Sequence, residues 1–168
     1  MKKTRFTTKP KIMKKHFPIT LLLLCALSAC SSSDEELRDM NDPEISSEGI
    51  TAMPIDCQVY ERGGVIPFNY VFNDNLELGS YNIEIHNNFN HHTHSTTSVD
   101  CEQDEKKAEV NPWVFDQDFT IPSGLRSFTA RHDISIPANV DTGDYHFMIR
   151  LLDKTGRMKI HSVAIKIK

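Results

Sequence analysis

The sequence predicts an all-β domain built as a two-sheet antiparallel β-sandwich. Three observations lead to this prediction: short runs in which apolar and polar residues alternate, turn residues at fairly regular spacing between these runs, and no long amphipathic helix with caps. A chain of 168 residues is long enough for one domain and too short for two comfortable cores. Short strands without helices favour a sandwich, and a small barrel is the alternative.

Five runs of residues are expected to form the main strands: 64–72, 81–86, 128–136, 145–151 and 158–167. The clearest alternation is in the second run, where Tyr81, Ile83 and Ile85 alternate with polar residues. The last two runs are expected to pair, because residues 153–156, Asp-Lys-Thr-Gly, have the composition of a hairpin turn.

One segment points to a particular sandwich topology. Residues 137–145, Pro-Ala-Asn-Val-Asp-Thr-Gly-Asp-Tyr, resemble the turn and the tyrosine-bearing strand near the end of immunoglobulin-like domains, where the tyrosine closes a corner. The predicted fold is therefore an immunoglobulin-like antiparallel β-sandwich. The polar stretch 87–109 fits no strand, and we expect one long His-rich loop there. A connection of that length is usually functional or disordered.

Residues 1–29 have the composition of a secretory signal peptide. Basic residues precede the apolar run 19–27, which is too short for a permanent membrane span. Residues 27–30, Leu-Ser-Ala-Cys, resemble the lipobox of bacterial lipoproteins, in which the cysteine is acylated and becomes the first residue. We expect Cys30 to hold the protein at a membrane through its lipid. The alternative is an ordinary signal peptide followed by a chance cysteine.

Residues 30–49 are expected to form an acidic flexible tether, and residues 50–168 the β-sandwich domain. The tether lacks apolar periodicity and begins with Ser-Ser-Ser-Asp-Glu-Glu directly after Cys30. An acidic patch in this place resembles the surface-export signal of Bacteroidetes lipoproteins. We therefore expect a lipid-anchored protein of the outer membrane that is exposed on the cell surface.

Charge argues against one class of partner. Seven of the 19 lysines and arginines lie in residues 1–29, so the rest of the chain has 12 basic residues against 23 acidic ones, a net charge of −11. Such a surface repels phosphate backbones, so we expect no nucleic acid as a partner.

Cys57 and Cys101 are the cysteines that remain after the signal peptide and Cys30. An exported protein folds in an oxidising compartment, where a disulfide can persist. We prefer a disulfide to metal ligation because two isolated thiols lack C-x-x-C spacing, although the sequence does not establish the pairing.

Histidines are concentrated in the long polar stretch, where four of the seven that follow residue 29 fall within nine residues. Neutral imidazole offers a nitrogen lone pair to zinc, copper, nickel or iron. A fifth histidine, His146 in the run 145–151, would lie close to His86 if that run pairs with residues 81–86. The candidate metal ligands are His86, His91, His92, His94 and His146, with Asp74, Glu84 or Asp100 completing the shell. The alternative is a solvated loop that binds metals adventitiously.

Other residues are assigned to structure. His132 is expected in the core or at its rim, and His161 on the surface. Met148 is expected to face the apolar side, so it does not argue for copper. Trp113 is expected to pack over an edge of the sandwich, the alternative being stacking on a sugar or a partner. The sequence contains no H-E-x-x-H, G-x-S-x-G or phosphate-loop motif, and we expect no enzyme.

Two blocks of sequence resemble one family. They are 74–76 with 81–94 (Tyr-Asn-Ile-Glu-Ile-His-Asn-Asn-Phe-Asn-His-His-Thr-His), and 134–138 with 143–150 (Gly-Asp-Tyr-His-Phe-Met-Ile-Arg). Together they resemble a Bacteroidetes lipoprotein family catalogued as domain of unknown function 4625, over roughly residues 50–168. The resemblance implies a lipid-anchored, immunoglobulin-like domain and directs attention to the histidines of both blocks. It also implies an acidic residue where this chain has Asn90.

Two functions from different classes follow. The first is a metal-binding or metal-handling accessory domain for zinc or copper, working with an outer-membrane receptor or importer. The second is a non-catalytic glycan- or protein-binding module of the cell surface that acts through the long loop. An enzyme with a metal-activated water would need an open coordination position and a substrate cleft, which the sequence does not indicate.

Overall fold

The computed structural model describes residues 39–93 and 101–168, and these residues contain eight strands and no helix. The strands are β1 (Glu44–Ser46), β2 (Gln58–Tyr60), β3 (Val65–Asn73), β4 (Leu78–Asn87), β5 (Phe115–Thr120), β6 (Ser127–Ser135), β7 (Gly143–Asp153) and β8 (Met158–Ile167). The predicted signal peptide and the lipidation site Cys30 lie outside the described residues. Within those residues, no helix is long and apolar enough to cross a membrane.

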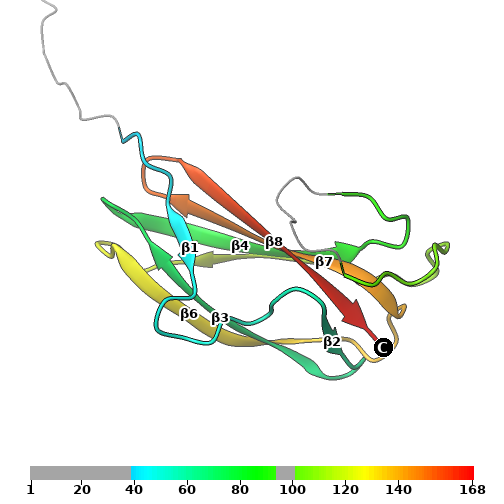
Figure 1. The fold of residues 1–168 in the computed structure, drawn as a ribbon. Helices are drawn as coiled ribbons and strands as arrows, with labels where there is room; N and C mark the ends of the chain where they lie inside the picture. The colour runs from blue at the N-terminus through cyan, green and yellow to red at the C-terminus, as the bar shows by residue number, and fades with distance from the viewer. Residues whose placement is uncertain (1–38, 94–100) are drawn as a thin grey trace, which may run out of the picture. The chain divides into compact units, whose positions relative to one another are not determined.

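Two sheets form the sandwich (Figure 1). One has three strands in the order β1-β3-β6, and the other has five in the order β2-β8-β7-β4-β5. Consecutive strands β3 and β4 lie in different sheets, and β7 lies between β4 and β8. This is the immunoglobulin arrangement, with β3 and β6 as strands B and E and with β4, β7 and β8 as strands C, F and G. The predicted all-β, immunoglobulin-like sandwich is confirmed.

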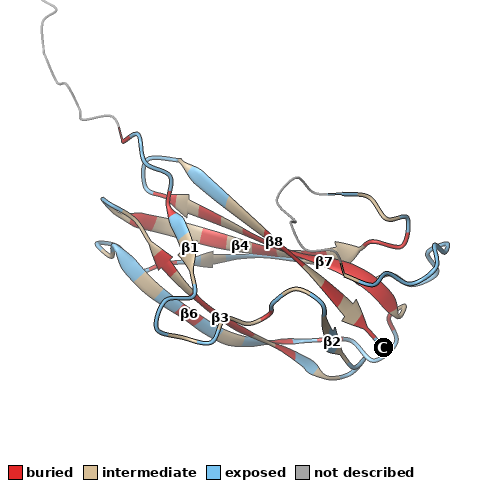
Figure 2. Cartoon of the chain, viewed as in Figure 1, coloured by how far each residue is buried: buried red, intermediate tan, exposed pale blue. Residues whose placement is uncertain are grey.

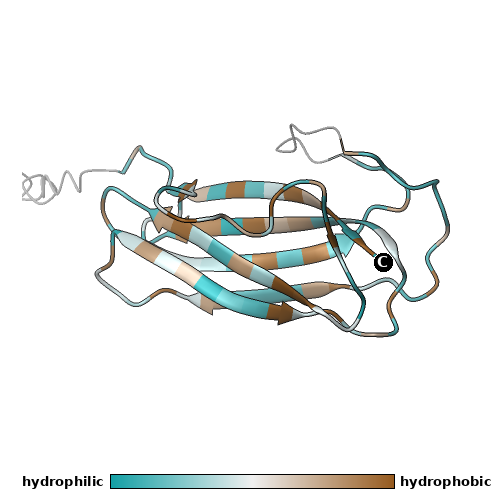
Figure 3. Ribbon diagram, turned by 60° about the horizontal axis from the view of Figure 1, so that its bottom comes forward, coloured by the Kyte–Doolittle hydropathy of each residue, from teal (hydrophilic) through white to brown (hydrophobic). Residues whose placement is uncertain are grey.

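Alternation along the strands places the core between the sheets. In β4 the side chains of Tyr81, Ile83 and Ile85 are buried, while the residues between them face outward (Figure 2). Bands of apolar and polar residues therefore succeed one another along each strand (Figure 3). At the centre, Phe68 of β3 stacks on Phe147 of β7, with ring centroids 6.0 Å apart.

The tyrosine corner has the predicted form. The hydroxyl of Tyr145, at the start of β7, donates a hydrogen bond to the backbone oxygen of Asp141, four residues earlier, at 2.7 Å. Phe147 follows two residues later, at the position where antibody domains have the second cysteine of their inter-sheet disulfide. Aromatic packing between Phe68 and Phe147 thus takes the place of that covalent link.

Several expectations differ from the structure. The tether does not extend to residue 49, because β1 pairs with β3 and places Ile45 opposite Phe72. The sheet is not wholly antiparallel, since β2 pairs in parallel with β8. Strands β1, β2 and β5 were not predicted. His161 is not a surface residue: it lies half-buried against Tyr70, with ring centroids 5.6 Å apart.

Strand β7 is buried on both of its faces. Its inner face contributes to the core, and its outer residues Asp144, His146 and Met148 are also buried. Met148 does not face the apolar core as expected, because it pairs with Glu84 and shares the outer face with His146. The candidate ligands lie on this outer face.

Candidate metal centre

His86 and His146 are direct neighbours across two paired strands. Strands β4 and β7 run antiparallel, and their register sets His86 opposite His146. Both side chains point to the outer face, since each alternates with residues of the core. Their ring centroids are 5.5 Å apart, and only 3% of His146 is exposed. The structure therefore brings these two histidines close together, as the sequence led us to expect.

His92 reaches the same point from the loop that follows β4. The buried residue Asn88 donates its backbone N–H to the oxygen of Asp144, and its own oxygen accepts from the N–H of His91 at 3.1 Å. His91 has a φ of 58°, in the left-handed region, which turns the chain back over the sheet. The ring of His92 then lies with its centroid 5.4 Å from that of His86 and 4.9 Å from that of His146.

Two ring nitrogens face each other. The Nε2 atoms of His86 and His92 are 3.3 Å apart. The other nitrogen of each ring lies close to an oxygen: Nδ1 of His86 lies 2.9 Å from Oε1 of Glu84, and Nδ1 of His92 lies 2.6 Å from Oδ1 of Asn90. When an oxygen acceptor takes the Nδ1 proton, the neutral ring has its lone pair on Nε2. Both lone pairs then point into the same space.

These distances fit a shared metal ion. Zinc–nitrogen bonds are about 2.0–2.1 Å, so two imidazole nitrogens on a tetrahedral ion are about 3.3 Å apart. With each ring centroid about 3 Å from the ion, ligating rings are about 5 Å apart, centroid to centroid. The separation of 3.3 Å between the Nε2 atoms of His86 and His92 agrees with the first value, and the three centroid distances of 4.9–5.5 Å are close to the second.

The third ring is oriented by the loop backbone. Nε2 of His146 lies 3.2 Å from the carbonyl oxygen of His92, to which it can donate its proton. In that tautomer the lone pair of His146 is on Nδ1, and either imidazole nitrogen can ligate a metal. Burial, together with the neighbouring His86, lowers the pKa of His92. The neutral form, which binds metals, is thereby favoured.

Of the other predicted ligands, some lie near the three rings, some lie elsewhere and some fall outside the described residues. His91 does not join the three rings through any contact of the described residues, because its Nε2 lies 2.9 Å from the carbonyl oxygen of Asp104. His94 and Asp100 lie outside the described residues. Glu84 does lie beside His86, whereas Asp74 belongs to another part of the molecule. Asn90, at the position where the family resemblance implies an acidic ligand or acceptor, contacts Nδ1 of His92.

The long loop is fastened to the sheet on both sides of the His cluster, which we define as His86, His92 and His146. Cys101 forms a disulfide with Cys57, which precedes β2. Lys166 of β8 forms an ion pair with Asp104 at 2.5 Å, and that contact raises the pKa of the lysine. Further on, the backbone N–H groups of residues 110 and 111 donate to Oδ2 of Asp141, and these bonds lower the pKa of that carboxyl.

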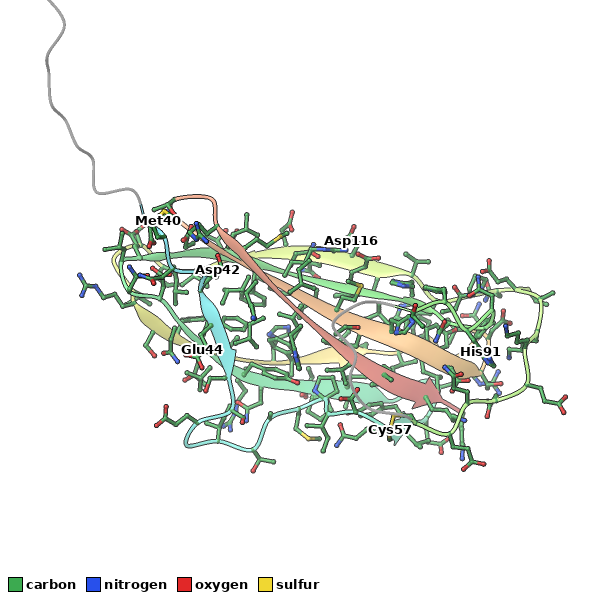
Figure 4. The ribbon with its side chains drawn as sticks, turned by 45° about the horizontal axis from the view of Figure 1, so that its top comes forward. Met40, Asp42, Glu44, Cys57, His91 and Asp116 are labelled. Carbon is green, nitrogen blue, oxygen red and sulfur yellow. A yellow bond between two sulfur atoms is a disulfide. The ribbon has the colours of Figure 1, made fainter. Side chains whose placement is uncertain are left out.

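A pocket opens beside the cluster. It has a volume of about 490 Å³ and lies between the loop and the outer face of β7 and β8. His92 and His146 line one part of it, and the disulfide and Lys166 line another. Figure 4 shows His91 and Cys57 at this end of the domain. A metal ion held by the cluster would be reachable from this pocket.

Comparison with known proteins identifies a family and a distant structural likeness. A family model described as "Domain of unknown function (DUF4625)" matches residues 28–168. No curated protein matches the chain. Among solved structures, the chain is similar to the sporulation control protein Spo0M from Bacillus subtilis, with 13% sequence identity, a TM-score of 0.42 and coverage of 77% of this chain. The chain spans half the length of that protein.

Proposed function

We propose that this chain, which belongs to the DUF4625 domain family, binds one transition-metal ion, zinc or copper, through the imidazoles of His86, His92 and His146. The observation that supports the proposal most directly is the pair of Nε2 atoms 3.3 Å apart, each in a ring whose Nδ1 lies next to an oxygen acceptor. A carboxylate or carbonyl oxygen behind a ligating histidine is the usual arrangement in metal sites, because it fixes the tautomer and the ring orientation.

A shared proton is the competing explanation for the short distance. One ring could be protonated and donate to the other, and a contact of 3.3 Å would suit a weak bond of that kind. The low pKa of His92 and the proximity of a second imidazole both disfavour the charged ring. If both rings are neutral, two nitrogen lone pairs face each other and repel. A metal cation bound between them removes that repulsion, so metal ligation is the better explanation.

The proposal is tested by titrating the full chain with zinc and with copper in a calorimeter, beside a His86→Ala/His92→Ala variant. We expect one ion per chain and loss of that binding in the variant. The matched control is His91→Asn, which removes a neighbouring histidine of the same loop and suits the left-handed backbone at that position. Unchanged binding in the double variant, or equal loss in the control, would contradict the proposal.

Two further variants refine the ligand set. His94 stays a prediction from the sequence, and His94→Ala tests whether it contributes. Met148 is buried on the outer face, two residues from His146, and its thioether would suit Cu(I) but not zinc. Met148→Leu is therefore expected to weaken copper binding while leaving zinc binding unchanged if the site serves copper. Copper affinity that Met148→Leu leaves unchanged would remove Met148 from the ligand set and with it this argument for copper.

The biological setting remains part of the proposal. We place the protein at the outer membrane, lipid-anchored through Cys30 and exposed on the cell surface, as a non-catalytic accessory of a metal receptor or importer. The acidic residues after Cys30 and the net charge of −11 beyond residue 29 support this setting. Radiolabelled palmitate incorporation, compared with a Cys30→Ala variant, tests the anchor. Protease accessibility on intact cells tests surface exposure.

The pocket beside the cluster favours one alternative function, a glycan- or protein-binding module. Its volume of about 490 Å³ lies in the range of small-ligand sites, and its walls are largely loop residues. The two functions separate in one experiment: cell-surface partners are captured with the chain before and after chelation of bound metal. Capture that persists without metal and in the His86→Ala/His92→Ala variant would favour the binding module.

A further inference from the structure

Three aspartates converge at the end of the domain opposite the His cluster. Asp39 precedes β1, Asp74 follows β3, and Asp153 ends β7, where it begins the hairpin to β8. One carboxylate oxygen from each lies within 4.8 Å of the other two. Figure 4 shows the neighbouring residues Met40 and Asp42 at this end, far from His91. The three residues come from separate parts of the chain.

Asp39 and Asp153 are buried and Asp74 is half-buried, and two of their oxygens have no hydrogen-bond partner among the described residues. Asp39 is 8% exposed and Asp153 is 4% exposed. The Oδ2 atoms of Asp39 and Asp74 are both buried and unpartnered within residues 39–93 and 101–168. A buried carboxylate oxygen without a hydrogen-bond donor has lost its hydration and gained no replacement bond, which costs free energy. A bound cation or a proton would remove that cost.

The Oδ1 atom of each carboxylate accepts hydrogen bonds, and in Asp153 the Oδ2 atom also accepts one, from the Thr155 hydroxyl at 3.0 Å. Oδ1 of Asp39 accepts from the N–H of Asn41 at 3.0 Å and from the side-chain amide of Asn75 at 3.2 Å. Oδ1 of Asp74 accepts from two backbone N–H groups at 2.8 Å, and Oδ1 of Asp153 does the same. These bonds fix the carboxylates in place.

No ion pair with any of the three carboxylates occurs in the described part of the chain. The nearest guanidinium, that of Arg157, is bound to Oδ1 of Asp42 and to the backbone oxygen of Asp39. Three carboxylates this close repel one another strongly in a buried setting. Arg157 supplies one positive charge near Asp39, and a bound cation would balance the rest.

We propose that Asp39, Asp74 and Asp153 form a calcium site that fastens the start of the domain to the β3–β4 turn and the β7–β8 hairpin. Calcium takes oxygen ligands at about 2.3–2.6 Å, so ligand oxygens on one ion lie up to about 5 Å apart, in agreement with the separations of 4.8 Å or less. The ligands are all carboxylates, which excludes a preference for zinc or copper. The site is distinct from the His cluster and does not depend on it.

The site is tested with the full chain in mild detergent, stripped with EDTA and then titrated with CaCl₂ alone. We expect a Kd of about 10⁻⁴–10⁻³ M, the range of extracellular calcium modules. At 10 mM calcium we expect the midpoint of thermal unfolding to rise by about 5 °C. In Asp39→Asn and in Asp74→Asn the rise is expected to disappear. Without calcium these variants should unfold no earlier than the parent, because they remove a repulsion while retaining the Oδ1 acceptor.

Two controls keep the outcomes distinct. Asp118→Asn removes an exposed carboxylate of β5 that contacts Asn82, and it is expected to keep the full calcium response. His86→Ala is also expected to keep it, so failure of the calcium site and failure of the His cluster are separable. Amide exchange in residues 44–46 is expected to slow when calcium binds. No thermal shift and no heat up to 10 mM calcium, or a full shift in Asp39→Asn, would overturn the proposal.

Discussion

Asn90 is the residue through which a small chemical change should most directly alter metal binding. Its side-chain oxygen lies 2.6 Å from Nδ1 of His92 and orients that ring toward His86. A neutral amide oxygen accepts this proton less strongly than a carboxylate does, so His92 is a weaker base here than it would be beside an acidic residue.

We predict that Asn90→Asp tightens zinc binding about tenfold, and that Asn90→Ala weakens it by a similar factor. A carboxylate in this place would strengthen the hydrogen bond and increase the electron density on the ligating nitrogen. Competition with a chromogenic chelator measures both constants. Gln103→Glu, which adds a charge to the neighbouring pocket, is the control for a general electrostatic effect. If Gln103→Glu tightened zinc binding as much as Asn90→Asp, the effect would come from added charge and not from the hydrogen bond between residue 90 and His92.

His132 should make the domain sensitive to acid. Its ring packs among aromatic side chains, with centroids 4.7 Å from Phe119 and 5.0 Å from Phe68. Burial lowers its pKa, and the nearby Asp133 only partly opposes this. The unfolded chain therefore takes up the proton at a higher pH than the folded chain. Stability is unaffected well above pH 6.5 and falls as the pH drops below that value.

Urea unfolding at pH 8 and at pH 5.5 measures this effect. We predict that the parent loses stability between the two pH values and that His132→Phe loses less, because phenylalanine cannot bind the proton. Some loss should remain in the variant, since burial also lowers the pKa of His161. His91→Asn, a change in the loop, is expected to behave like the parent. Equal losses in His132→Phe and the parent would show that His132 takes no part.

At the scale of elements, the tyrosine corner joins the start of β7 to the loop before β5. The Tyr145 hydroxyl donates to the oxygen of Asp141 at 2.7 Å and accepts from the buried backbone N–H of Trp113 at 3.2 Å. We predict that Tyr145→Phe lowers the free energy of unfolding by about 1–3 kcal/mol, because both groups lose a partner inside the protein. Urea denaturation measures the change.

Tyr60→Phe is the matched comparison for the corner. Its hydroxyl also makes one short hydrogen bond, to Oε1 of Gln58 at 2.6 Å, but the residue is only half-buried. Water can replace that bond, so the expected cost is well under that of Tyr145→Phe. A larger cost at Tyr60 than at Tyr145 would contradict the importance given to the corner.

The disulfide ties the loop to the edge of the five-stranded sheet. Cys57 and Cys101 are 44 residues apart in sequence, and the loop that carries His92 lies between them. We predict that Cys57→Ser/Cys101→Ser lowers the free energy of unfolding by about 2–4 kcal/mol. It should also weaken zinc binding, because His92 then has to be ordered when the ion binds. Urea unfolding measures the change in stability, and zinc titration without urea, where both proteins are folded, measures the change in affinity. A zinc affinity equal to the parent's would mean that β4 and the turn at Asn88 suffice to place His92.

Strands differed in how readily the sequence revealed them. The core strands β3, β4, β6 and β8 were predictable from alternation, because one face of each faces the core, and β7 was predictable because its apolar residues Tyr145, Phe147, Ile149 and Leu151 alternate even though both of its faces are buried. Strand β5 contains Asp116 and Asp118, is largely exposed and lies at the edge of its sheet, so its backbone pairing leaves no apolar pattern. Strands β1 and β2 have three residues each, too few for any period to appear.

At the scale of the whole molecule, the sequence could indicate which residue types gather but not all of the groups that surround them. The closeness of His86 and His146 followed from a guess that their strands are neighbours, which the register bears out. The position of His92 depends on a turn with a left-handed residue at His91, and that turn has no strong sequence signal. The three aspartates are far apart in sequence, so only the folded chain brings them together.

The two proposed sites are joined by β7, which has His146 near its first residue and Asp153 at its end. The two residues are seven positions apart along the strand, a distance of about 23 Å. Sites this far apart in a rigid sandwich should act independently, since coupling requires an element with two alternative arrangements.

We predict that saturating calcium changes the zinc affinity by less than twofold. Zinc titration in EGTA-buffered and in 10 mM calcium solutions measures this, with Asp39→Asn as the control. A larger change, lost in Asp39→Asn, would show that β7 or the loops beside it transmit binding from one end of the domain to the other, and by reciprocity zinc would then alter calcium affinity by the same factor.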